Sequence, residues 1–60
     1  MTFVEACDFM ASGGIVESCR GRRFTGRNGQ LFMLGPGGKY IFGFGLLEDE
    51  VTGAWQAVDS

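Results

Sequence analysis

The first apolar residues of the chain recur at the spacing of a helix. Between residues 1 and 14 they fall at i, i+3, i+4, i+7 and i+8, on one stripe: Phe3, Ala6, Cys7, Met10 and Ala11. Thr2 and Glu5 form a T-x-x-E capping box, the sequence mark of a helix start. Ser12-Gly13-Gly14 follows, and glycine readily takes the left-handed conformation that ends a helix. The pattern predicts an amphipathic helix over MTFVEACDFMASGG.

Shorter apolar runs, separated by turn residues, follow the predicted helix. IVESCR begins with two β-branched residues and predicts a strand, and GRR predicts a turn. Asn28-Gly29 is a strong hairpin signal when apolar runs flank it. The run before it, Phe24-Thr25, is weak, whereas the run after it, residues 31–34, is strong. This segment therefore predicts two strands joined at Asn28-Gly29.

The segment LFML-GPGG-KYIFGF predicts a second hairpin. A four-residue loop over residues 35–38 would set four pairs of residues opposite each other: Leu34 and Lys39, Met33 and Tyr40, Phe32 and Ile41, and Leu31 and Phe42. Both faces of such a hairpin are apolar. Because one helix covers only one face of a sheet, we expect the second face to meet the C-terminal segment, another subunit or a target.

The C-terminal part of the chain predicts two short elements. LLEDEVTG is acidic and predicts one helical turn, and AWQAVD predicts a last strand. The whole pattern predicts a single α+β domain over residues 1–60, with an N-terminal helix packed on a small antiparallel sheet of three to five strands. A folded chain of this size buries only about 60% of the surface that its unfolded form exposes, so an oligomer or a partner often completes the core.

Charge is sorted along the chain, although the net charge is only −2. The five basic residues all lie between positions 20 and 39, and the seven acids all lie outside that segment. Such asymmetry is typical of proteins with charged partners. The alternative is that opposite charges pair within the fold.

The residue types disfavour catalysis and a metal site. The chain has no histidine, so Cys7, Cys19 and the serines lack an ordinary general base, and two cysteines alone cannot complete a tetrahedral zinc site. We expect both cysteines, reduced, in the core or on a half-buried face. No signal peptide and no apolar run near the roughly 20 residues that span a bilayer is present, so we expect a cytoplasmic protein.

The basic stretch GRRFTGRNGQ has three interpretations. Its arginine forks and glycines suit phosphate binding, with Phe24 or Tyr40 stacked on a base. General nucleic-acid binding is a second interpretation, which the acidity of the whole chain disfavours. The third is a solvated hairpin whose arginines pair with Glu17 and the acidic turn.

The acidic turn Glu48-Asp49-Glu50 has two interpretations. A small acidic domain can occupy a basic nucleic-acid channel on another protein, because the attraction is long-ranged and speeds encounter. Alternatively, the turn is a solvated loop near a helix N-terminus, where the helix dipole favours acids.

The two ends of the chain carry motifs that occur together in a known protein family. The family begins Met-Thr-Phe-x-Glu-Ala and runs through an amphipathic helix and a glycine into a strand. The matching positions here are Met1, Thr2, Phe3, Glu5, Ala6, Gly14 and Val16. GQLFML resembles the next strand of the family. LLEDEVTGAWQAV resembles its ending, an acidic turn and a tryptophan-bearing strand, with matches at Glu50, Val51, Trp55 and Val58. The resemblance covers about half of the chain.

In these motifs the chain resembles a family of small phage anti-defence proteins. The family includes anti-CRISPR proteins and Thoeris anti-defence proteins, and the latter sequester a cyclic nucleotide signal. Where members usually have an arginine and a tryptophan after the first strand, this chain has SCRGRRF, with Phe24 near that place. The middle segment, which helps to build the ligand pocket of the sequestering members, is shorter here. The resemblance therefore favours inhibition of a protein target.

From these observations we expect a non-enzymatic anti-CRISPR inhibitor that binds a Cas effector and blocks its nucleic-acid-binding or nuclease function in the host bacterial cytoplasm. Its expected contact residues are the acidic turn and two aromatics: Glu48, Asp49, Glu50, Tyr40 and Phe44. The alternative is a sponge for a cyclic nucleotide signal, with four ligand residues: Arg22, Arg23, Arg27 and Phe24. A structural phage or host subunit is a third hypothesis. We expect no cofactor, no membrane contact and no direct nucleic-acid contact, and a homo-oligomer is left open.

Overall fold

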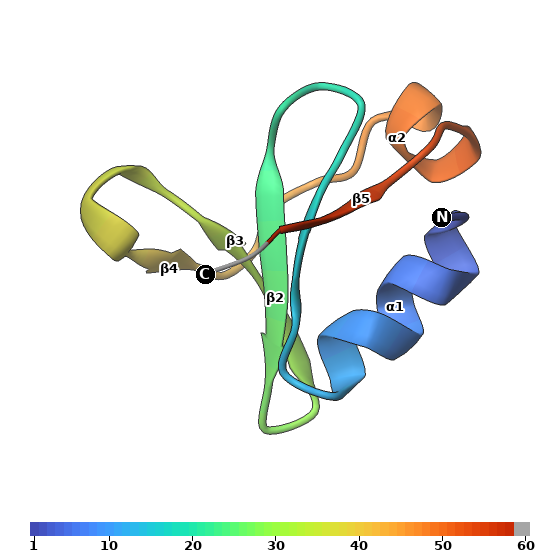
Figure 1. The fold of residues 1–60 in the computed structure, drawn as a ribbon. Coiled ribbons are helices and arrows are strands. Elements are labelled where there is room, and N and C mark those ends of the chain that lie inside the picture. The colour runs from blue at the N-terminus through green and yellow to red at the C-terminus, as the bar shows by residue number, and fades with distance from the viewer. Residues whose placement is uncertain (59–60) are drawn as a thin grey trace.

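A computed structural model describes residues 1–58, which form a helix packed against a five-stranded antiparallel sheet (Figure 1). In chain order the elements are α1 (Phe3–Ala11), β1 (Ile15–Glu17), β2 (Arg23–Arg27), β3 (Gln30–Leu34), the short 3₁₀ helix η1 (Pro36–Gly38), β4 (Tyr40–Ile41), α2 (Glu48–Thr52) and β5 (Gln56–Val58). The strands lie side by side in the order β4-β3-β2-β1-β5. The predicted α+β fold is confirmed. Asp59, at the end of the predicted last strand, lies outside the described residues.

The start of α1 has the capping box that the sequence predicts. The Glu5 backbone N–H donates to Thr2 Oγ1 at 3.2 Å, and the Thr2 backbone N–H donates to Glu5 Oε1 at 2.8 Å. The helix ends at Ala11, and Gly13 then takes a φ of 92°, which a residue with a side chain rarely adopts. Both ends of α1 are therefore set by local sequence.

The β2–β3 hairpin turns at Asn28-Gly29, as predicted. Both residues have positive φ, 52° and 76°, and Arg27 pairs directly with Gln30 across the two-residue turn. Turns with two positive φ angles match the twist of the flanking strands, which is why Asn-Gly is favoured there.

The β3–β4 pairing differs from the predicted register by one residue. Leu34 lies opposite Tyr40 and Met33 lies opposite Ile41, because the connection contains residues 35–39 rather than four residues. The Gly35 N–H closes this longer loop by donating to the Lys39 carbonyl at 2.8 Å. A shift of one residue moves every side chain of a strand to the other face. Tyr40 therefore shares a face with Leu34, not with Met33.

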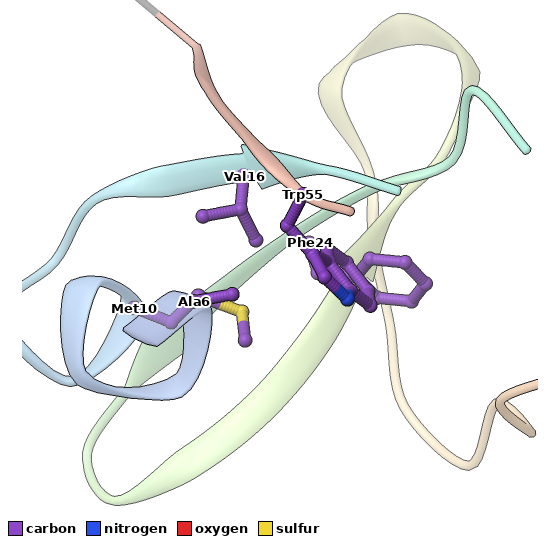
Figure 2. Packing of buried hydrophobic residues seen from close by; sticks show 5 residues of the cluster. All are labelled: Ala6, Met10, Val16, Phe24 and Trp55. Atoms are coloured by element: carbon purple, nitrogen blue, oxygen red, sulfur yellow. The ribbon is translucent and has the colours of Figure 1, made fainter. Parts of the chain in front are cut away.

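The face of the sheet beneath α1, which we call the covered face, holds the core. Its fully buried side chains, shown in Figure 2, are Ala6, Met10, Val16, Phe24 and Trp55. The ring centroids of Phe24 and Trp55 lie 5.5 Å apart. At Gly26 a Cβ would lie 2.6 Å from the Met10 carbonyl oxygen, so the helix packs directly on the backbone of β2. No helix lies on the other side of β3 and β4 in the described residues; we call this the open face (Figure 1).

Candidate functional site

Glu50 was expected in an exposed acidic contact surface, but the structure buries it. Its side chain is 0% exposed. The Ser18 hydroxyl donates to Oε2 at 2.6 Å, the Leu47 N–H donates to Oε1 at 3.0 Å, and Arg22 Nε lies 3.4 Å from Oε2. A third-position glutamate commonly turns back to the start of its helix, which accounts for the Leu47 contact. Glu50 thus anchors α2 to the β1–β2 turn.

The other two acids of this segment remain at the surface. Asp49 Oδ2 accepts a hydrogen bond from Arg20 Nε at 2.6 Å, whereas Glu48 has no ion pair within residues 1–58. Leu47 and Val51 are both exposed beside Glu48. Four of these residues line an open depression of about 430 Å³ together with Thr52: Arg20, Leu47, Glu48 and Asp49. We call Leu47, Glu48, Asp49 and Val51 the α2 surface.

The residues expected to hold a nucleotide do not converge. Phe24 is 1% exposed in the core and cannot stack on a base. Arg22 lies above the Phe24 ring, 5.3 Å from its centroid, and its Nη2 donates to the Gly45 carbonyl at 2.7 Å. Arg23 Nε pairs with Glu17 Oε1 at 3.0 Å. The expected stacking role of Phe24 is therefore wrong, because alternation along β2 sends Phe24 to the covered face and Arg23 and Arg27 to the open face.

Internal pairing accounts for three arginines of the basic segment. Their ion pairs are Arg20–Asp49, Arg22–Glu50 and Arg23–Glu17. The interpretation in which the arginines pair with Glu17 and the acidic turn is confirmed for these residues. Arg27 is different, because it forms no ion pair in the described part of the chain. Its guanidinium carbon lies 4.8 Å from the centroid of the Tyr40 ring.

Three aromatic rings gather on the open face. The Phe32 centroid lies 5.9 Å from that of Tyr40 and 5.8 Å from that of Phe42. Phe42 is 68% exposed and Tyr40 is 47% exposed. We call Phe32, Tyr40 and Phe42 the aromatic cluster. It is uncovered because α1 occupies the other face, and the corrected β4 register places Tyr40 beside Phe32.

Phe44, expected beside Tyr40 as a partner contact, instead packs on the core. It is half-buried, and its ring centroid lies 5.0 Å from that of Phe24. The single residue Gly43, with a φ of 81°, separates it from Phe42. The chain turns there from the open face to the covered face, so Phe42 and Phe44 have different surroundings.

A small pocket lies at the tip of the β2–β3 hairpin. It has a volume of about 170 Å³ and is lined by Cys7 and Ala11 of α1 and by residues 26–31. Pockets for drug-sized ligands typically measure about 300–1,000 Å³. Among the described residues, Arg27 is the one charged residue that lines it. The pocket therefore offers little support for a nucleotide sponge.

The cysteines are both free, and only one lies where we expected. Cys7 belongs to α1 and is half-buried against the core. Cys19 follows β1 in a turn and is exposed, and its Sγ donates to the Asp49 carbonyl at 3.3 Å. Within residues 1–58, no group of three histidine, cysteine or acidic side chains is placed to hold a metal ion. No helix of this part of the chain has the length and apolar character needed to cross a membrane.

Comparisons of the chain with protein-family models, curated proteins and solved structures gave no match. Two surfaces of the molecule are the candidate contact sites, the α2 surface and the open face. Figure 1 shows α2 and β4 on opposite sides of β2. The acids and aromatics that were expected to form one contact belong to separate regions of the molecule.

Proposed function

We propose that this protein is a non-enzymatic inhibitor of a bacterial defence system, of the anti-CRISPR type, which binds a Cas effector through the α2 surface. The observation that carries the proposal is Glu48, which has no ion pair within residues 1–58 and lies between two exposed apolar side chains, Leu47 and Val51, beside an open depression. A surface of this kind combines apolar contact with a charge aimed at a basic partner. Such a partner surface is typical of proteins that handle nucleic acids.

The two kinds of side chain have separate roles in the proposed contact. Glu48 attracts a basic surface over a distance and raises the rate of encounter, and salt weakens this effect. Leu47 and Val51 lose exposed apolar area on docking, which favours the bound state. Asp49 contributes less, because Arg20 already neutralises it. Glu50 contributes only by holding α2 in place.

A plating assay tests this proposal. The protein is expressed in a panel of bacterial strains that each carry one CRISPR type, and a phage targeted by that system is plated on each. We expect plating to recover in at least one strain and to remain unchanged in the matching strain without the effector. If plating recovered in none of the strains, the result would contradict the proposal.

Two charge-reversal variants locate the contact. Glu48→Lys should lose inhibition, whereas Asp8→Lys, an exposed acid of α1, should keep it. With the purified effector from the responsive strain, the affinity lost by Glu48→Lys should be larger at low salt than at high salt. Equal behaviour of the two variants would remove the α2 surface from the mechanism.

A further inference from the structure

We propose that the open face binds single-stranded nucleic acid, with bases stacked on Phe42 and Tyr40 and the phosphates near Arg23 and Arg27. This site is separate from the α2 surface and does not depend on the proposed inhibition. The proposal is based on three observations: a supported aromatic cluster, an arginine held against it, and the separation of the exposed acids from that face.

The aromatic cluster offers rings that are both exposed and held in place. Phe32 is half-buried and lies within 6 Å of its two neighbours, 5.9 Å from Tyr40 and 5.8 Å from Phe42, so it supports them from below. Phe42 and Tyr40 leave much of their ring surface to solvent. Exposed aromatics on a β-sheet are stacking surfaces for unpaired bases, and every base has a face that can stack.

Arg27 supplies a positive charge beside these rings. Its guanidinium carbon lies 4.8 Å from the Tyr40 centroid, and it has no acidic partner within the described residues. A guanidinium in this position can receive a phosphate in its fork, or extend the stacking surface with its own plane. Arg23 lies on the same face of β2, four residues earlier, with Glu17 as its partner.

Five of the six acids within residues 1–58 lie away from this face. Glu5 and Asp8 project from α1, Glu48 and Asp49 lie on α2, and Glu50 is buried. In the described residues, Glu17 is the acid that shares the open face, and Arg23 neutralises it. The net charge of −2 led us to expect no direct nucleic-acid contact. The distribution over the faces removes the basis of that expectation.

Charge also favours a nucleic-acid strand over a second copy of the chain. A symmetric dimer places the same patch of both subunits against each other. Dimerisation through the aromatic cluster would bring the two copies of Arg27 together, and within the described residues the one acid of this face, Glu17, is already paired with Arg23. A phosphate backbone, in contrast, provides a negative charge beside each base.

Fluorescence anisotropy with a labelled single strand of oligothymidylate tests the proposal. A length of about 10 nucleotides lies within the site size of a small strand-binding domain. We expect saturable binding, with a similar response to oligouridylate and little response to a duplex of the same length. Phe42→Ala should weaken binding by about tenfold, since one stacked base is lost. Arg27→Gln should lower the slope of log affinity against log salt by about 0.7.

Val4→Ala is the matched control, because Val4 is as exposed as Phe42 but lies on α1. It should bind the strand like the unchanged protein. Circular dichroism checks that each variant is folded, and Arg27→Gln provides a second test that leaves the aromatic cluster intact. The proposal would be overturned by absent binding, by equal affinity of Phe42→Ala and Val4→Ala, or by sedimentation showing a dimer that Phe42→Ala dissociates. The inhibition assay with Glu48→Lys is read separately, so either proposal can fail alone.

Discussion

The two faces of the sheet carry similar side chains with opposite surroundings. On the covered face, Phe24 is 1% exposed and packs against Trp55 and Phe44. On the open face, Phe42 is 68% exposed, and its ring centroid lies 5.8 Å from that of Phe32. The difference is α1, which packs on one face, whereas no helix of the described residues packs on the other (Figure 1). Aromatic residues thus serve stability on one face and remain available for binding on the other.

The largest expected effect is a difference in stability between a substitution on the covered face and one on the open face. Phe24→Ala should lower the free energy of unfolding by about 3–5 kcal/mol, because it leaves a cavity in the core. The total free energy of unfolding of a domain this small is only about 5 kcal/mol, so the variant should be largely unfolded at room temperature. Phe42→Ala should cost less than about 1 kcal/mol, since its ring is already solvated. Urea unfolding followed by circular dichroism measures both, and equal losses would contradict the division between the faces.

The close approach of α1 to β2 gives the next largest effect. A methyl group added at Gly26 would lie 2.6 Å from the Met10 carbonyl oxygen, so Gly26→Ala must push the helix away from the sheet. We expect a loss of about 1–3 kcal/mol. Gly45→Ala is the control, because no atom lies within 4 Å of its added Cβ, and its change should stay within about 0.5 kcal/mol. Thermal unfolding of the two variants decides between them.

Substitution of the buried acid of α2 should cost more stability than substitution of an exposed one. Glu50→Gln removes the charge beside Arg22 and disturbs the hydrogen bond from Ser18, which leaves buried polar atoms poorly matched. A loss of about 1–3 kcal/mol is expected. Glu48→Gln, at an exposed position, should change stability by less than about 0.5 kcal/mol. If chemical denaturation gave equal values, the anchoring role of Glu50 would be wrong.

The smallest expected effect concerns the capping box at the N-terminus of α1. The hydrogen bond from the Thr2 backbone N–H, followed by that with the Thr2 side chain, lowers the pKa of Glu5 below its ordinary value. Because the folded-state pKa is the lower one, this contribution to stability is present above the unfolded pKa of about 4.3. It is lost as the pH falls through the folded pKa. Glu5→Gln should therefore lose less stability than the unchanged protein when denaturation is repeated at about pH 3, whereas identical pH dependence would argue against the capping box.

Local features of the fold were predictable from the sequence. The Thr2–Glu5 capping box and the Asn28-Gly29 turn each depend on residues within a few positions of one another, and both predictions are confirmed. The β3–β4 register was not predictable in the same way, because the glycine-rich segment 35–38 accommodates a four-residue or a five-residue connection. That single residue decides which face Tyr40 occupies.

The surroundings of the candidate site residues depended on distant contacts. Glu50 is buried by Ser18, which precedes it by 32 positions, so no local pattern distinguishes it from Glu48. Strand alternation predicts Phe44 on the same face as Tyr40, but the turn at Gly43 sends it to the core. The L-x-x-E spacing from Leu47 to Glu50 was the available signal for a carboxylate that turns back on its helix, although leucine is not a capping residue.

The most direct test of the two-face account is a titration of the ¹⁵N-labelled protein with unlabelled single-stranded oligothymidylate, followed by two-dimensional NMR. If the open face binds the strand, the largest shift changes occur at the amides of Arg27, Phe32, Tyr40 and Phe42. The amides of Ala6, Val16 and Glu48 should change little. Changes centred on α2 or α1, or no changes at all, would contradict the claim that the open face is the binding face.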